Sequence, residues 1–184
     1  MDDFQLEFGL NKTDKLLKTF EEIHNYVYAN DGLSTHQTLE EITKILFVKI
    51  FDEKKDTNSF KINKNEFDLI RNSQKSESFT ERIGNLFDKT KSEFIDLFEK
   101  EEKIRLSNAS LSFIVNKLQN ISLIDSTTDS SGLAFQKFIS RYEKDSRGQF
   151  FTPEQIIDFC VKIIDPSANE SIIDPACGSG GFLI

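Results

Sequence analysis

The sequence has no tryptophan, only two cysteines and no apolar run long enough to cross a membrane. Two cysteines cannot form the disulfide framework of a small secreted protein, and the chain starts without a secretory leader, so we expect a cytoplasmic protein. The two histidines, His24 and His36, lack the spacing of metal ligands and have no cysteine cluster nearby. We therefore expect surface or capping roles for both, and no metal site.

An excess of basic residues is also missing. Lys and Arg total 23 against 31 Asp and Glu, which gives a formal net charge of −8 at pH 7. A nucleic-acid-binding module usually carries a basic patch, so this composition argues against a module that grips DNA by itself. A DNA enzyme stays compatible with the charge if its basic surface lies on other parts of the enzyme or on a partner.

Glycine and proline are scarce, with eight and three residues, and most of them lie in the last forty positions. Before that point, apolar residues recur at helical spacing. The spacing predicts helices over residues 12–30, 34–51, 63–70, 79–98, 111–118 and 133–139, with a central position for residues 34–51, a polar loop at 52–59 and a turn-rich segment at 125–131. Ser34 with Gln37, and Asn63 with Glu66, have the pattern of capping boxes. We predict an orthogonal or bundled helical domain over residues 1–140.

The sequence pattern changes after a charged linker at residues 143–147, where glycine and proline become more frequent. Thr152 followed by Pro153 and Gln155 is typical of a capped helix start, and this helix is predicted to run to Ile164. Residues 171–173 read as a short buried strand that leads into a glycine turn and a second helix start. Such a unit is the first half of a Rossmann-like fold. The predicted fold class is therefore mainly α, a helical domain followed over residues 141–184 by the truncated start of an α/β domain.

The glycine turn carries the chemistry. A carboxylate at the end of a strand, Asp174, precedes Gly178, Gly180 and Gly181, whose missing side chains let a ligand approach the backbone. Free amide groups after the turn favour an anionic group, and the carboxylate favours a cation, so a ligand with an amino-acid moiety would satisfy both. A phosphate-binding P-loop would need a lysine where Phe182 stands, and the dinucleotide Gly-x-Gly-x-x-Gly pattern is absent. A turn that uses glycine only for its geometry remains the alternative.

Residues 174–183, DPACGSGGFL, resemble the S-adenosylmethionine motif of the N6-adenine DNA methyltransferase family. Residues 148–153, GQFFTP, resemble the segment that precedes this motif in the family and folds against the methionine end of the cofactor. The two segments have the family's order and separation. A weaker resemblance, over residues 32–53, is to the helical N-terminal domain of the modification subunits of type I restriction-modification systems.

The resemblance implies cofactor-binding roles for nine residues. Four would line the methionine side of the cofactor: Gln149, Phe150, Thr152 and Pro153. Asp174 would orient the ammonium group, and four residues would approach the cofactor through their backbones: Ala176, Gly178, Ser179 and Gly180. For Cys177 we expect a small residue packed beneath the loop rather than a nucleophile, and for Cys160 a core position.

The family's catalytic motif, (Asn/Asp)-Pro-Pro-(Phe/Tyr), does not occur in the sequence, so no catalytic residue is predicted. In the family this motif holds an adenine flipped out of the duplex. The resemblance thus implies an N-terminal fragment that is inactive and binds S-adenosylmethionine weakly or not at all. The implied partners of the whole enzyme are double-stranded DNA and the specificity and restriction subunits of a restriction-modification complex, without a membrane or a metal.

Other functions stay open at this point. A helical interaction module for protein or DNA, without enzymatic activity, would make the glycine-rich tail incidental. A methyltransferase that acts on a protein glutamine or on a small molecule shares part of the motif chemistry. A single-chain methyltransferase with a fused nuclease is an alternative to a separate type I subunit.

Overall fold

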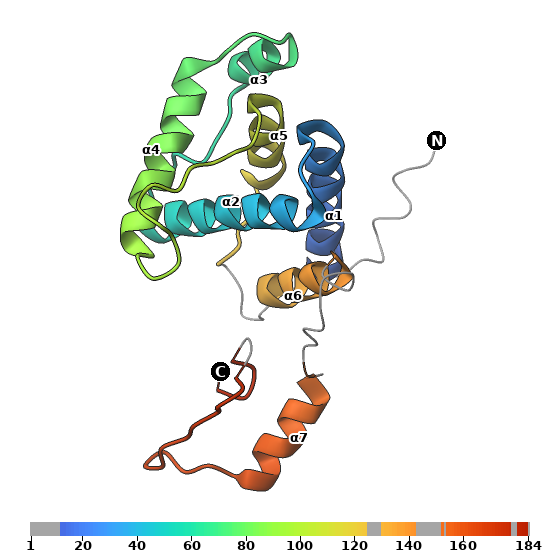
Figure 1. The fold of residues 1–184 in the computed structure, drawn as a ribbon, viewed down its shortest axis with the longest axis vertical. Coiled ribbons are helices and arrows are strands. Elements are labelled where there is room, and N and C mark those ends of the chain that lie inside the picture. The colour runs from blue at the N-terminus through green and yellow to red at the C-terminus, as the bar shows by residue number, and fades with distance from the viewer. Residues whose placement is uncertain (1–11, 125–129, 143–151, 153, 178–179, 184) are drawn as a thin grey trace. The chain divides into compact units, whose positions relative to one another are not determined.

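The computed structural model describes residues 12–124, 130–142, 152, 154–177 and 180–183. Within these residues the chain forms seven α-helices and no strand (Figure 1). The mainly helical class is therefore confirmed. The chain divides into two compact units, Met1–Tyr142 and Glu143–Ile184.

Six helices build the first unit: α1 (Lys12–Asp31), α2 (Thr35–Lys55), α3 (Lys64–Arg71), α4 (Glu77–Glu93), α5 (Asn108–Leu118) and α6 (Ser130–Tyr142). Helix α1 packs against α2, α5 and α6, helix α2 against α4 and α6, and α3 against α5. In Figure 1, α2 crosses α1 and α5 instead of running alongside them, so the unit is an orthogonal helical assembly.

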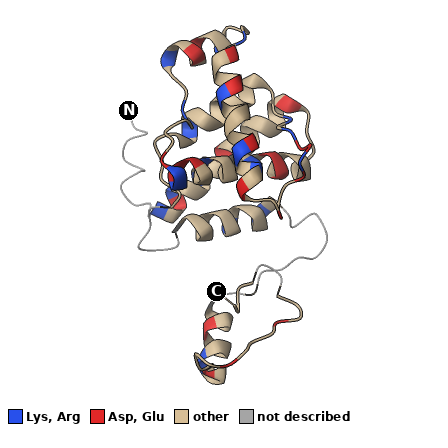
Figure 2. Cartoon of the chain, turned by 90° about the vertical axis from the view of Figure 1, so that its left-hand side faces the viewer, with Lys and Arg blue, Asp and Glu red and all other residues tan. Residues whose placement is uncertain are grey.

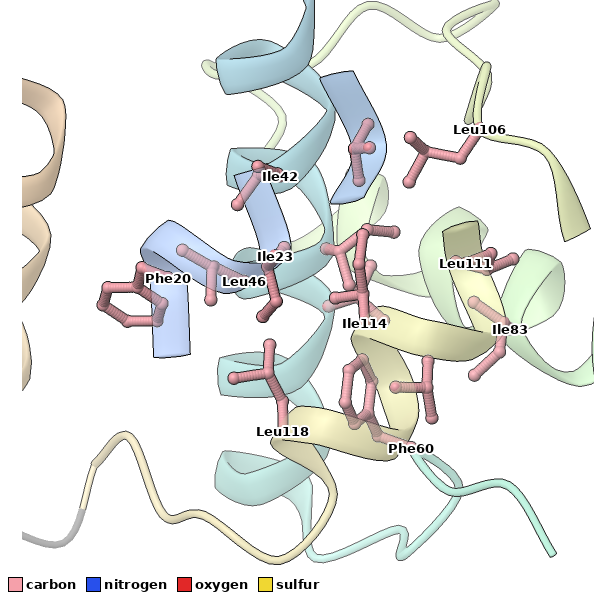
Figure 3. Close-up of a cluster of buried hydrophobic side chains, with 14 of the residues drawn as sticks. Phe20, Ile23, Ile42, Leu46, Phe60, Ile83, Leu106, Leu111, Ile114 and Leu118 are labelled. Atoms are coloured by element: carbon pink, nitrogen blue, oxygen red, sulfur yellow. The ribbon is translucent and has the colours of Figure 1, made fainter. Parts of the chain in front are cut away.

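Helix α2 lies at the centre, as its broad apolar face predicts. Ile42, Ile45 and Val48 are completely buried, because α2 is covered by several other helices at once. In Figure 3, side chains from α1, α4 and α5 converge on it, among them Ile23 and Ile114. Close packing of these branched aliphatic side chains stabilises the centre of the unit.

Both predicted capping boxes are present. The Ser34 hydroxyl accepts a hydrogen bond from the Gln37 amide at 3.2 Å, and the Gln37 side chain accepts one from the Ser34 amide at 3.0 Å. Asn63 and Glu66 make the same reciprocal pair at the start of α3. Local side-chain chemistry therefore fixes where these two helices begin.

Two helix ends differ from the prediction. Helix α2 continues to Lys55, four residues into the segment predicted as a loop, and ends at Asp56 in the left-handed conformation. Helix α4 stops at Glu93, although apolar residues continue at helical spacing beyond it. Phe94 and Phe98 instead fold back onto the core, where both rings make edge contacts with Phe47.

The prediction of a surface or capping role for His24 is wrong. Its side chain is buried between α1 and α6 and stacks on Tyr142. His36 has an exposed side chain, which lies 3.4 Å from Glu40.

Charged residues of both signs are interspersed along the helices of the first unit (Figure 2). Several are paired across helices or to the connecting segments, for example Glu66 with Arg82 and Lys117 with Glu22. Among the helices of the described residues, none combines the length and the apolar character that a membrane span needs.

The described part of the second unit contains one helix, α7 (Glu154–Ile164), which ends before Pro166 as predicted. Asp165 takes the left-handed conformation with φ of 46° and its amide donates to the Val161 carbonyl at 2.8 Å. The buried strand predicted at residues 171–173 is not formed, and Ile172 and Ile173 are 59% and 88% exposed. A strand needs a neighbouring strand for its backbone hydrogen bonds, and the described part of this unit supplies none. Residues 180–183 form turns in place of the predicted helix start.

Candidate cofactor site

The side chain of Asp174 accepts a hydrogen bond from the backbone of the turn that it begins. Its Oδ1 accepts a hydrogen bond from the Ala176 amide at 3.0 Å, which is the geometry of an Asx turn and is local to the Asp-Pro-Ala sequence. The Asp174 residue is half-buried, while Ala176 is exposed. No residue that the structure describes donates a hydrogen bond to Oδ2, so this oxygen is available to accept one from a ligand.

The chain then reverses through two successive turns. The Gly180 amide donates to the Cys177 carbonyl at 2.7 Å, and the Leu183 amide donates to the Gly180 carbonyl at 2.8 Å. Gly180 has φ of 81°, a left-handed conformation that costs an L-residue with a side chain about 1–2 kcal/mol. The sequence therefore places a glycine where the backbone requires one.

The neighbouring glycine, Gly181, has a different role. A Cβ atom built on it would lie 2.8 Å from Cδ1 of Ile157 in α7. Carbon atoms in contact are normally about 3.5–4.0 Å apart, so the absent side chain is what lets helix α7 and the turn touch. The structure thus joins the helix that follows Thr152 to the turn that begins at Asp174.

Five of the nine predicted cofactor residues lie outside the described residues: Gln149, Phe150, Pro153, Gly178 and Ser179. The other four are Thr152, Asp174, Ala176 and Gly180. Thr152 is exposed and lies two residues before α7. Among the described residues, the contact between Ile157 and Gly181 brings the helix after Thr152 next to the turn that begins at Asp174.

Neither of the two cysteines forms a disulfide. Cys177 is exposed, so the prediction that it packs beneath the loop is wrong, and Cys160 is half-buried instead of a core residue. The reason is the same for both: the apolar interior that would cover them is not formed by the described part of the second unit.

Sequence reasoning gave no role to Ile157, and for Gly181 it predicted only the close approach of a ligand. A signal was present in the pair Gly180-Gly181, because one positive-φ position explains only one glycine. A second glycine directly after it indicates a close approach by another element, and the nearest preceding apolar helix supplies Ile157.

The chemistry of these residues fits an amino-acid moiety. Oδ2 of Asp174 can accept a hydrogen bond from an ammonium group, and backbone amides of a glycine turn can donate to a carboxylate. A cavity of about 430 Å³ lies elsewhere, in the first unit between α4, α5 and residues 100–106, and none of the predicted cofactor residues line it. Across the described ranges, no cluster of three or more His, Cys, Asp or Glu residues could hold a metal ion.

Comparison with known proteins bears on the same segment. Residues 126–184 match the family model described as N-6 DNA Methylase. This C-terminal segment is therefore similar to N-6 DNA methylases. The matched segment includes α6, α7 and the Asp174 turn, and so it contains the candidate site.

Three curated relatives are similar to parts of this chain. The EcoEI type I restriction enzyme methylase subunit of Escherichia coli is 58% identical over 36 residues, 20% of this chain and 7% of the relative. The MjaIX methylase subunit of Methanocaldococcus jannaschii is 33% identical over 84 residues, 43% and 15% of the two chains. The HindI methylase subunit of Haemophilus influenzae is 37% identical over 59 residues, 30% and 13%. The chain therefore matches at most 15% of the length of these relatives. No solved structure matches it.

Proposed function

We propose that this chain is the N-terminal part of a site-specific DNA adenine-N6 methyltransferase of a restriction-modification system, which uses S-adenosylmethionine as methyl donor. The match of residues 126–184 to the N-6 DNA methylase model carries the proposal. The three relatives are methylase subunits of type I restriction enzymes, which supports a modification subunit that works with double-stranded DNA and with specificity and restriction subunits.

Residues 1–140 are the helical N-terminal domain in this proposal, and residues 141–184 begin a Rossmann-like methyltransferase domain. The exposed apolar side chains of the second unit support this division. Ile163, Ile172 and Ile173 are 66%, 59% and 88% exposed, which is unfavourable in water and typical of a surface that another element covers. The remaining strands and helices of a complete sheet would bury them.

The geometry of the turn supports the proposed cofactor site. Asp174 accepts a hydrogen bond from the ammonium group through Oδ2, while its Oδ1 keeps the turn closed. Gly180, together with Ala176, Gly178 and Ser179, brings the backbone close to the cofactor, and the segment of Gln149, Phe150, Thr152 and Pro153 covers the methionine side. When bound, S-adenosylmethionine supplies a methyl group activated by the sulfonium charge. The residues assigned here bind and orient the donor.

The experiment uses the complete reading frame that carries this chain, expressed with its specificity subunit. Duplex DNA is incubated with S-adenosylmethionine labelled in the methyl group, and the nucleosides are separated. We expect the label in N6-methyladenine. Label in a protein, in a small molecule or in cytosine, or no transfer despite bound cofactor, would overturn the proposal.

Asp174→Asn tests the cofactor site in the same protein. The amide keeps the shape of the side chain but loses its charge, so we expect binding of S-adenosylmethionine to weaken by about tenfold to a hundredfold. Asp158→Asn is the matched control, because Asp158 lies on α7 with a side chain that is 63% exposed. Calorimetric titration measures the affinity of both variants for S-adenosylmethionine. Equal affinities would show that Asp174 does not bind the cofactor.

A further inference from the structure

Helix α7 has two apolar stripes with different surroundings. Ile157, Cys160 and Val161 are half-buried, at the spacing of one helix face. Ile156, Phe159 and Ile163 are 50%, 63% and 66% exposed. The contact of Ile157 with Gly181 shows that the half-buried stripe includes the point where the glycine turn meets the helix.

The two adjacent glycines of the turn are required for different physical reasons. Gly180 has φ of 81°, so a side chain there strains the backbone whatever space surrounds it. Gly181 lies outside the left-handed region, and its constraint is steric, because Cδ1 of Ile157 fills the position of a Cβ. A substitution at Gly181 therefore acts on α7, whereas one at Gly180 acts on the turn itself.

We propose that Ile157 is a positioning residue for the methyl-donor site. Its contact with Gly181 sets the spacing between the segment entering α7 at Thr152 and the turn that begins at Asp174. This inference rests on the proposed function. An α-helix is stiff over a single turn, so a displacement at Ile157 is carried to the start of α7 at Glu154, two residues after Thr152.

The contact makes a size-dependent prediction. Alanine at position 181 would have to push Cδ1 of Ile157 outwards by close to 1 Å to reach an ordinary carbon–carbon distance. Cδ1 is the far end of the side chain, so a strained rotamer of Ile157 can absorb part of this displacement. A cost of this kind corresponds to binding of S-adenosylmethionine that is weaker by about threefold to tenfold.

The decisive test is a steric rescue in the full-length protein. Ile157→Val removes Cδ1, the atom that an alanine at position 181 would meet. We expect Gly181→Ala to weaken S-adenosylmethionine binding, and the double variant to bind better than Gly181→Ala alone. Gly180→Ala is the matched control, because its backbone strain should not be relieved by Ile157→Val.

A ligand comparison separates positioning from a general loss of stability. Titrations use S-adenosylhomocysteine, which has the amino-acid moiety, and methylthioadenosine, which lacks it. If Ile157 positions the methionine side, Gly181→Ala should weaken the first ligand more than the second. A merely structural defect would weaken both equally and would overturn the role of Ile157.

The remaining outcomes are also distinguishable. A double variant no better than Gly181→Ala, in a wild-type background that binds the donor, overturns the inference and leaves the proposed function intact. A wild-type full-length protein that does not bind S-adenosylmethionine overturns the proposed function and with it the role of Ile157. Thermal unfolding of the same variants, without any cofactor, then still reports whether positions 157 and 181 are in contact.

Discussion

The imidazole ring of His24 in α1 stacks on the phenol ring of Tyr142 at the end of α6, with ring centroids 3.7 Å apart and planes at 28°. His24 is only 3% exposed, and neither ring nitrogen makes a hydrogen bond of good geometry with the described residues. Phe138 meets the imidazole edge-on at 6.1 Å. This aromatic cluster holds α6, the last helix of the first unit, on α1.

The burial of His24 predicts a pH-dependent stability. Desolvation lowers the pKa of His24, and a hydrogen-bonding contribution from Asn25 offsets this only in part. A histidine whose folded-state pKa lies below its ordinary value of 6.5 binds more protons in the unfolded state. Its contribution to stability is therefore complete above pH 6.5 and is lost as the pH falls through the folded-state pKa, by at most about 1.4 kcal/mol per pH unit.

Urea unfolding of the chain between pH 7 and pH 5 measures this loss. His24→Phe keeps an aromatic ring in the stack and removes the titrating group, so the free energy of unfolding should depend less on pH. At pH 7 it should stay within about 1 kcal/mol of the wild type, because no hydrogen bond of good geometry is lost. His36→Gln is the control, since the His36 side chain is 63% exposed. An unchanged slope in His24→Phe would contradict the assignment.

The sequence best predicted the features that depend on contacts between residues close together in the chain. Ser34 with Gln37 and Asn63 with Glu66 cap their helices through contacts only three residues apart, so the pattern contains all the information needed. The apolar stripes of the first unit are local in the same sense. The buried position of His24 depends on Tyr142, which is 118 residues away, and nothing in the neighbourhood of His24 indicates it.

The candidate site likewise has some features that depend on neighbouring residues and others that depend on residues far away in the sequence. The positive φ of Gly180 and the Asx turn of Asp174 follow from short-range backbone rules. The strand predicted at residues 171–173 depends on partner strands, and without them in the described residues Ile173 is left 88% exposed. The contact between Ile157 and Gly181 joins two elements that a connecting segment separates in the sequence. The sequence motif contains the glycine but does not indicate which residue contacts it.

Two neighbouring glutamates in α2 provide a second prediction. Glu41 is completely buried and accepts three hydrogen bonds of 2.8 Å, from Nζ of Lys44 and from both Nε and the backbone amide of Arg105. Glu41→Gln would place an amide group among these donors and leave charges without a partner. We expect the free energy of unfolding to fall by about 2–4 kcal/mol.

Glu40 is the matched control for Glu41. It also pairs with Arg105, at 2.9 Å, but its side chain is 44% exposed and solvent screens the interaction. Glu40→Gln should leave the urea midpoint nearly unchanged at pH 7. Equal losses in the two variants would show that burial does not decide the strength of these pairs.

Glu66 links the start of α3 to α4 and gives the third prediction, in acid. Arg82 donates to both carboxylate oxygens, at 2.8 and 3.0 Å, and this pairing is the largest influence that lowers the pKa of Glu66 below its ordinary value of 4.5. Stability from Glu66 is therefore present above pH 4.5 and is lost as the pH falls through the lowered pKa. Glu66→Gln should cost about 1–3 kcal/mol at pH 7 and should flatten the acid limb of the stability profile. Glu81→Gln, at an exposed position of α4, controls for the loss of one carboxylate, and an acid limb as steep in Glu66→Gln as in this control would contradict the prediction.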